Sequence, residues 1–142
     1  MNRTLFSILL LSPLLLFGGT KEGWDHFETF VLKKDQIQKV AVYEEEKEHT
    51  LAFRWTLYQN GGLVMHVAYD SRRFQPLLYA KYRLDSFRID LFSKPNDASP
   101  KEGENPYALL VFKAYDAKRK EAYFDLLIKS YGKSEILYER GK

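Results

Sequence analysis

Two runs of alternating residues on either side of a glycine turn constrain the fold of this chain most. Across residues 51–58 large apolar side chains alternate with small or polar ones, and the same period of two recurs across residues 63–70. Asn60-Gly61-Gly62 lies between them, and Asn-Gly between two such runs is a strong signal for a β-hairpin. Since a period of two puts one face of a strand in the core, the sequence predicts a half-buried antiparallel hairpin.

Burial of the large side chains selects a register for this hairpin. A two-residue turn would place Trp55 opposite His66 and mix apolar with polar side chains on each face. A three-residue loop of Asn60, Gly61 and Gly62 keeps every large apolar side chain on one face. This second register pairs Leu57 with Met65, Trp55 with Val67 and Phe53 with Tyr69. We therefore expect the three-residue loop.

A second hairpin is predicted from residues 107–115 and 121–129, joined by residues 116–120. One face of this hairpin is continuously apolar, with Ala114 paired to Ala122, Phe112 to Phe124, Leu110 to Leu126 and Ala108 to Ile128. The other face places Lys113 opposite Tyr123 and Val111 opposite Asp125. That face is amphipathic, and we expect it to contact solvent.

The remaining strands complete an all-β chain. Residues 26–32, 37–43 and 135–139 are rich in β-branched or aromatic side chains, which favour strands. Residues 77–92 fit either two strands, 77–82 and 87–92, or a helix beginning after Pro76; their alternation favours strands. The sequence thus predicts a single-domain antiparallel meander of eight or nine strands, folded as a sandwich or closed as an up-and-down barrel.

The N-terminus has the layout of a secretion signal peptide. Arg3 precedes an apolar run over residues 5–17, and Gly18-Gly19-Thr20 supplies small residues before the first charges of the main domain. The run is short for a membrane-spanning helix, which needs about 20 residues. We expect residues 1–20 to be removed, after Gly19 or Thr20, and the domain of residues 21–142 to be periplasmic or secreted and not membrane-spanning.

Composition narrows the chemistry available to the chain. It has no cysteine, so disulfides, thiolate metal sites and cysteine nucleophiles are excluded. The formal net charge is +3, and the basic pairs fall in predicted turns. A nucleic-acid surface would need such groups gathered on one face with aromatics between them, so no nucleic-acid partner is expected. Residues 94–106 carry three prolines and many charges and are predicted to form a long mobile loop.

No catalytic or cofactor motif stands out in the sequence. The histidines are His26, His49 and His66, and their spacing matches no metal-binding pattern. The serines lack the glycine-flanked turn of an activated nucleophile. Residues 44–48 form an acidic stretch that we interpret as a solvated loop. We predict no catalytic residue, no metal site and no cofactor.

By exclusion, the leading hypothesis is an exported, non-enzymatic binding or accessory module that acts through a sheet face on an unknown protein partner. The candidate surface consists of the polar and aromatic positions left once both apolar faces are buried. These positions are Arg54, Thr56, Tyr58, His66, Lys113 and Tyr123. One alternative is a β-barrel carrier of a small apolar ligand. A second alternative is a hydrolase whose acids, drawn from Asp70, Asp85, Asp90 and Asp125, converge from separate strands.

Overall fold

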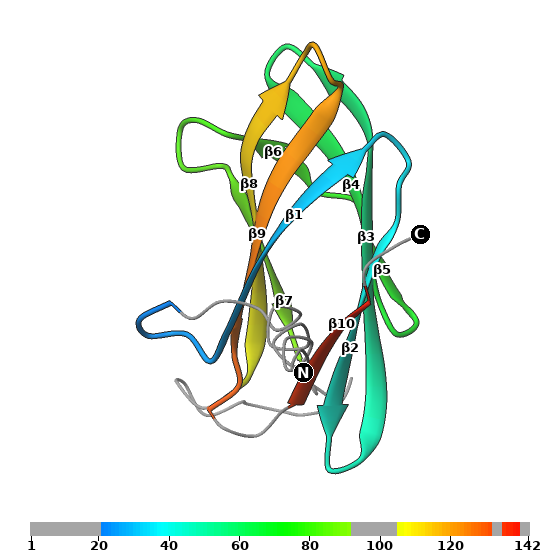
Figure 1. Cartoon of the computed structure of the whole chain (residues 1–142), viewed down its shortest axis with the longest axis vertical. Coiled ribbons are helices and arrows are strands. Elements are labelled where there is room, and N and C mark those ends of the chain that lie inside the picture. Colours follow the sequence, from blue (N-terminus) through cyan, green and yellow to red (C-terminus); the bar gives the residue numbers. More distant parts are fainter. Residues whose placement is uncertain (1–20, 92–104, 132–134, 140–142) are drawn as a thin grey trace, which may run out of the picture.

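The described residues form ten β-strands in two antiparallel sheets (Figure 1). The structure is a computed structural model, and it describes residues 21–91, 105–131 and 135–139. The predicted signal peptide, and all but the last two residues of the predicted loop 94–106, lie outside the described residues. The strands are β1 (His26–Lys33), β2 (Gln38–Glu44), β3 (Lys47–Gln59), β4 (Gly62–Tyr69), β5 (Arg72–Phe74), β6 (Leu77–Tyr79), β7 (Ser86–Asp90), β8 (Tyr107–Asp116), β9 (Glu121–Lys129) and β10 (Glu135–Glu139).

Each sheet includes one strand from the far end of the chain. The four-stranded sheet has the order β1-β9-β8-β7. The six-stranded sheet has the order β10-β2-β3-β4-β5, and β6 also pairs with β4. The first strand of the fold thus joins the hairpin near the C-terminus, where Phe30 pairs with Phe124. The last strand joins the sheet built from the first half of the chain, where Tyr138 pairs with Val40.

The core lies between the inner faces of the two sheets, where alternate residues of the longer strands are buried. The ring of Phe53 in the six-stranded sheet lies 5.6 Å from that of Phe30 and 6.1 Å from that of Phe124, both in the four-stranded sheet. These contacts hold the sheets face to face. The prediction of an all-β antiparallel fold is confirmed, as is its sandwich form. The closed barrel is wrong, and the described residues form ten strands rather than eight or nine, because β5, with three residues, is too short to show an alternation.

The β3–β4 hairpin has a different register from the predicted one. Asn60 and Gly61 form a two-residue turn, both with left-handed backbone (φ 54° and 81°), and Gln59 pairs with Gly62. A β-bulge at Thr56 then shifts the register, so that Trp55 pairs with Met65. The predicted three-residue loop is therefore wrong. The bulge supplies the one extra residue that keeps large side chains on the inner face with the shorter turn.

The same correction applies to the end of the β8–β9 hairpin. The predicted pairs from Ala108 to Phe112 are present, as is Val111 opposite Asp125. Beyond them a bulge at Lys113 shifts the register, so that Ala114 pairs with Tyr123 and Tyr115 with Ala122. The predicted pairs of Ala114 with Ala122 and of Lys113 with Tyr123 are therefore wrong.

The two bulges together bring an aromatic cluster between the sheets near the upper end in Figure 1. The rings of Tyr58 and Tyr115 stack with centroids 3.9 Å apart, and the ring of Trp55 meets Tyr115 edge-on at 5.7 Å. The indole Nε1 of Trp55 donates to the carbonyl oxygen of Leu32 at 2.8 Å, which ties β3 to the end of β1. Leu57, predicted to be buried, is instead 49% exposed.

The other ambiguous segments are now defined. Residues 77–92 form β6 and β7 rather than a helix, as their alternation favoured. The acidic loop 44–48 is a tight hairpin turn, in which Glu45 and Glu46 both adopt left-handed backbone (φ 48° and 68°). In the described ranges, no helix is long and apolar enough to cross a membrane.

Candidate functional site

The structure separates the predicted interaction surface into three parts. Arg54, Thr56 and His66 belong to the outer face of the six-stranded sheet, and Arg54 pairs directly with His66. Tyr58 packs against the core between the sheets. The remaining two, Lys113 and Tyr123, belong to β8 and β9 of the other sheet. Arg54 and His66 are brought together at a concave feature of this outer face.

A shallow groove of about 470 Å³ opens on this outer face, and Arg54 and His66 line it. Its floor includes Ala52 and Ala68, which pair directly across β3 and β4. Arg73, on β5, pairs with Ala68 and lines the groove on the far side. Two methyl side chains at adjacent positions between longer ones leave a hollow in a sheet face.

The groove combines basic groups with apolar surface. Ile37, which is 48% exposed, and Phe74 supply apolar lining. Arg54 contacts Asp35 with a nitrogen–oxygen distance of 3.6 Å, and both side chains are substantially exposed, so solvent screens this pair. With two arginines, a histidine and one acid at its margin, the groove suits a ligand that carries a carboxylate or phosphate beside a small apolar group.

On the opposite side of the sandwich, polar contacts cross the outer face of the four-stranded sheet. Lys113 lies 3.8 Å from a carboxylate oxygen of Asp125. The other oxygen of Asp125 accepts a hydrogen bond from the Thr29 hydroxyl at 3.2 Å. These contacts join three neighbouring strands, and we interpret them as support for the sheet.

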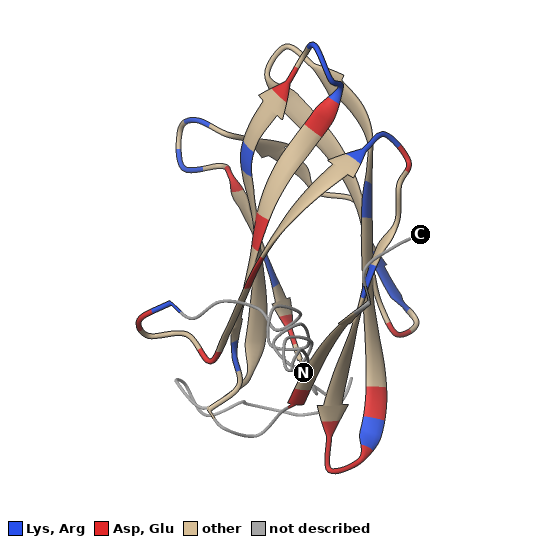
Figure 2. Cartoon of the chain, in the orientation of Figure 1, with Lys and Arg blue, Asp and Glu red and all other residues tan. Residues whose placement is uncertain are grey.

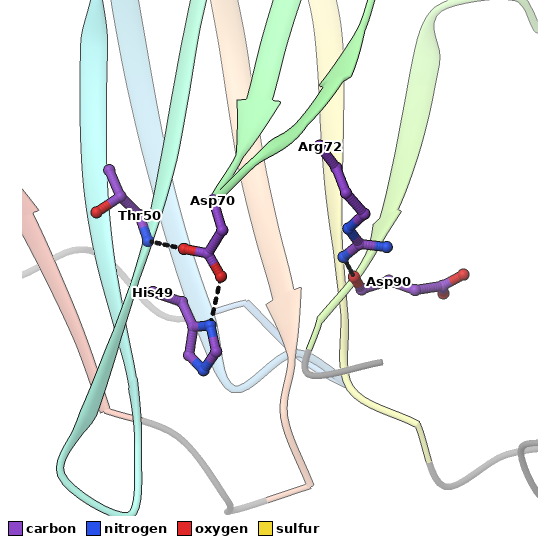
Figure 3. Close-up of polar contacts among 5 residues, drawn as sticks. All are labelled: His49, Thr50, Asp70, Arg72 and Asp90. Atoms are coloured by element: carbon purple, nitrogen blue, oxygen red, sulfur yellow. Dashed lines mark hydrogen bonds and ion pairs between the residues drawn. The ribbon is translucent and has the colours of Figure 1, made fainter. Parts of the chain in front are cut away.

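A histidine–aspartate pair lies where β3 begins (Figure 3). Nδ1 of His49 is 2.6 Å from Oδ2 of Asp70, and Oδ1 of Asp70 accepts from the backbone N–H of Thr50 at 3.0 Å. Burial acts to raise the pKa of Asp70, but the hydrogen bonds from His49 and Thr50 outweigh it and hold the pKa below its usual 3.8. His49 also stacks on the buried Tyr69.

An Asp-oriented imidazole is one part of a general-base arrangement, but its position indicates a different role. Asp70 has left-handed backbone (φ 52°) in the β4–β5 turn, and its N–H donates to the carbonyl oxygen of Thr50. The pair thus fixes that turn against β3. Arg72, after the turn, reaches across to the other sheet and donates to the carbonyl oxygen of Asp90 at 2.8 Å (Figure 3).

The acids that a hydrolase would need do not gather in one place. Asp125 pairs with Lys113 and Thr29 on the outer face of one sheet, whereas Asp70 belongs to a turn of the other. Asp85 precedes β7, at the opposite end of that strand from Asp90. Within residues 21–91, 105–131 and 135–139, no three His, Asp or Glu side chains are grouped to hold a metal ion.

Two polar atoms are buried between the sheets without a hydrogen-bond partner in the described part of the chain. They are Oε2 of Glu28, on β1, and the hydroxyl of Tyr138, on β10. Burial, and secondarily the charge of Glu28, raise the pKa of the Tyr138 phenol well above its usual 10.0. These groups face the seam between the two sheets, where the exchanged terminal strands form the edges.

Sequence reasoning found Arg54 and His66 but missed Arg73 and the alanine floor. The alternation in residues 51–58 and 63–70 identifies which side chains point outward, and Ala52 and Ala68 are among them. Their direct pairing depends on the bulge at Thr56, which the alternation does not show. Arg73 reaches the groove from a strand of three residues, too short to give a periodic signal.

Function on a fold of this kind has to be argued from the site, because one architecture hosts many activities. The groove of Arg54, His66 and Arg73 is the candidate binding site on the described surface. No protein-family model, no curated protein and no solved structure matches this chain.

Proposed function

We propose that this protein is an exported, non-enzymatic binding module that holds an anionic group in the groove of Arg54, His66 and Arg73. The observation that carries the proposal is the groove itself: three basic side chains surround a floor of small and apolar residues on one open sheet face. Guanidinium groups bind carboxylate and phosphate through paired hydrogen bonds, while the alanine floor admits a flat apolar group.

The N-terminal sequence supports the exported part of this proposal, and that support does not depend on the groove. The basic start, apolar run and small-residue end of residues 1–20 are typical of a secretion signal. The mass of the chain recovered from its producing cells tests this part of the proposal. A mass that corresponds to a start near residue 20 supports export, and a chain that still begins at Met1 contradicts it.

The two alternative functions have less to support them. A carrier would hold its ligand inside a closed barrel, whereas this fold is two sheets packed on a common core. A hydrolase needs converging acids, whereas Asp70 and Asp125 lie in different sheets with separate partners. Neither alternative uses the groove.

The groove is tested by an NMR titration with benzoate, which joins one carboxylate to one flat apolar ring. We expect the amide signals of Ala52, Arg54 and Ala68 to move with benzoate and not with benzylammonium, which has the opposite charge. The variant Arg54→Gln/Arg73→Gln should lose the response, since both paired donors are removed.

A matched control replaces two basic groups on the other sheet, as Arg88→Gln/Lys113→Gln, and should titrate like the original protein. If benzylammonium moves the same signals as benzoate, or if both double variants respond alike, the groove has no preference for anions and the proposal is wrong. Native mass spectrometry of the recovered protein then identifies any ligand that remains bound.

A further inference from the structure

Three basic turns of this chain, scattered in sequence, meet at one end of the sandwich (Figure 2). Lys33 pairs with Glu121, so the β1–β2 turn lies beside the β8–β9 turn. Gly62 pairs with Tyr79, so the β6–β7 loop lies beside the β3–β4 turn. All four connections lie toward the upper end in Figure 1. We call this surface the basic end; its basic side chains, all exposed, are Lys33, Lys34, Lys81, Arg83, Lys118, Arg119 and Lys120.

The acidic residues nearby offset this charge only in part. They are Asp35, Asp85, Asp116 and Glu121. Asp35 contacts Arg54, and Oδ1 of Asp116 accepts hydrogen bonds from the backbone N–H groups of Lys118 and Arg119. None of the ion pairs formed among the described residues uses a basic side chain of the basic end. These cations are therefore available to a partner.

Large apolar side chains are exposed beside these cations. Tyr82 is 84% exposed and Leu84 57% exposed, both in the β6–β7 loop. Leu57 and Leu77, which are about half exposed, flank Val64 on the adjoining strands. Both Tyr82 and Arg83 hold left-handed backbone (φ 70° and 58°), a strained conformation for bulky residues. The loop thus presents an aromatic ring to solvent between Lys81 and Arg83, and a leucine directly after Arg83.

One turn at the opposite end of the molecule carries the opposite charge. The β2–β3 turn, at the lower end in Figure 2, contains Glu44, Glu45, Glu46 and Glu48 with Lys47 as its one basic residue. An anionic surface would attract the basic end and repel this turn, which fixes an end-on orientation.

From this arrangement we propose that the basic end docks on an anionic phospholipid membrane. Cations near such a surface bind it electrostatically, and neighbouring apolar side chains enter the interfacial region. Leucines dominate the exposed apolar set, and they partition into lipid but do not stack on bases. Single-stranded nucleic acid is bound by aromatic platforms between cations, and only Tyr82 could serve as one. A lipid surface is therefore the partner that fits.

Vesicle flotation tests this proposal with the whole chain as recovered from cells, so that every variant has the same N-terminus. Vesicles of phosphatidylcholine are compared with vesicles that contain an equal amount of phosphatidylglycerol. We expect binding to depend on phosphatidylglycerol and to weaken with added salt. The variant Lys34→Glu/Lys118→Glu should lower the partition constant at least tenfold, because each basic residue near the surface contributes about fivefold.

The control variant Lys21→Glu/Lys39→Glu has the same net charge, changed away from the basic end, and should bind within twofold of the original. Replacing Tyr82 tests the apolar contact: asparagine accepts left-handed backbone, so Tyr82→Asn should fold normally and bind several-fold more weakly. If both charge variants lose the same amount of vesicle binding, net charge alone explains the binding and the proposal is wrong. Tighter binding to a DNA oligonucleotide than to the vesicles at the same salt concentration would also overturn it, in favour of nucleic acid.

Discussion

The rings of Tyr58 and Tyr115 stack 3.9 Å apart across the two sheets, at an interplanar angle of 22°. Each tyrosine follows a β-bulge by two residues, Thr56 in β3 and Lys113 in β8. Each bulge shifts the alternation of its strand by one residue, so both rings turn inward at the same level. The two bulges together thus produce the Tyr58–Tyr115 stack.

This stack predicts energetic coupling between the two sheets. Tyr58→Ala and Tyr115→Ala should each lower the free energy of unfolding by about 2 kcal/mol or more. The double variant should lose less than the sum, with a coupling of about 0.5–1.5 kcal/mol. Urea unfolding of the four proteins gives this value. The pair Tyr58→Ala/Tyr123→Ala is the control, because Tyr123 belongs to the outer face, and its effects should add.

The β2–β3 turn predicts that the protein can be stabilised. Glu45 and Glu46 both hold left-handed backbone, which costs roughly 1–2 kcal/mol for a side chain that does not favour it. Asparagine followed by glycine fits such a turn. Glu45→Asn/Glu46→Gly should therefore raise the free energy of unfolding by about 1 kcal/mol or more.

Charge has to be separated from backbone conformation in that experiment. Glu45→Gln/Glu46→Gln removes the same two charges and keeps unfavourable side chains in the turn. It should give a smaller gain than Asn-Gly in the same urea titration. Equal gains would assign the effect to charge repulsion instead of backbone strain.

Acid should weaken the fold through Asp25. Burial acts to raise the pKa of Asp25, but hydrogen bonds from the backbone N–H groups of Ser130 and Tyr131 and from the Ser130 hydroxyl outweigh it, so the pKa lies below 3.8. A carboxyl with a lowered pKa in the folded state stabilises the fold above its ordinary pKa. That stabilisation is lost as the pH falls through the folded value.

The variant Asp25→Asn measures this contribution. It should be less stable than the original protein at about pH 6, and the difference should be smaller at about pH 3, where the unfolded chain has taken up most of the proton that the folded carboxyl resists. Urea midpoints at the two pH values give the comparison. A difference that is constant between them would mean that the charge of Asp25 contributes nothing.

Alkali should weaken the fold through Tyr138. The raised pKa of its buried phenol means that the unfolded chain releases this proton at a lower pH than the folded protein does. Stability from this group is therefore complete below about pH 10 and is lost as the pH rises above it. Tyr138→Phe should flatten the alkaline side of the stability curve.

At neutral pH the same variant should be as stable as the original or more stable. The Tyr138 hydroxyl is buried with no partner among the described residues, and removing such a group recovers part of its desolvation cost, about 1 kcal/mol. A loss of stability at pH 7 would show that the hydroxyl has a bonding partner in solution.

The sequence predicted strand positions well because the signal for them is local. Alternation placed Phe53, Trp55, Met65 and Val67 on one buried face, and all four are buried. The alternation could not predict the bulges at Thr56 and Lys113, because it is a local signal. The two tyrosines that the bulges bring together, Tyr58 and Tyr115, are far apart in the chain. The groove could be predicted only in part. The local alternation shows that Arg54 and His66 point outward, whereas the position of Arg73 depends on how β5 pairs with β4.

The exchange of terminal strands also determines when this chain can fold. Neither sheet is complete without a strand from the far end: β1 needs β9, and β2 needs β10. Pairings such as Phe30 with Phe124 span most of the domain, so the contact order is high and folding is expected to be slow. A growing chain can form its local hairpins early, but it cannot complete its two sheets until β9 and β10 have been synthesised.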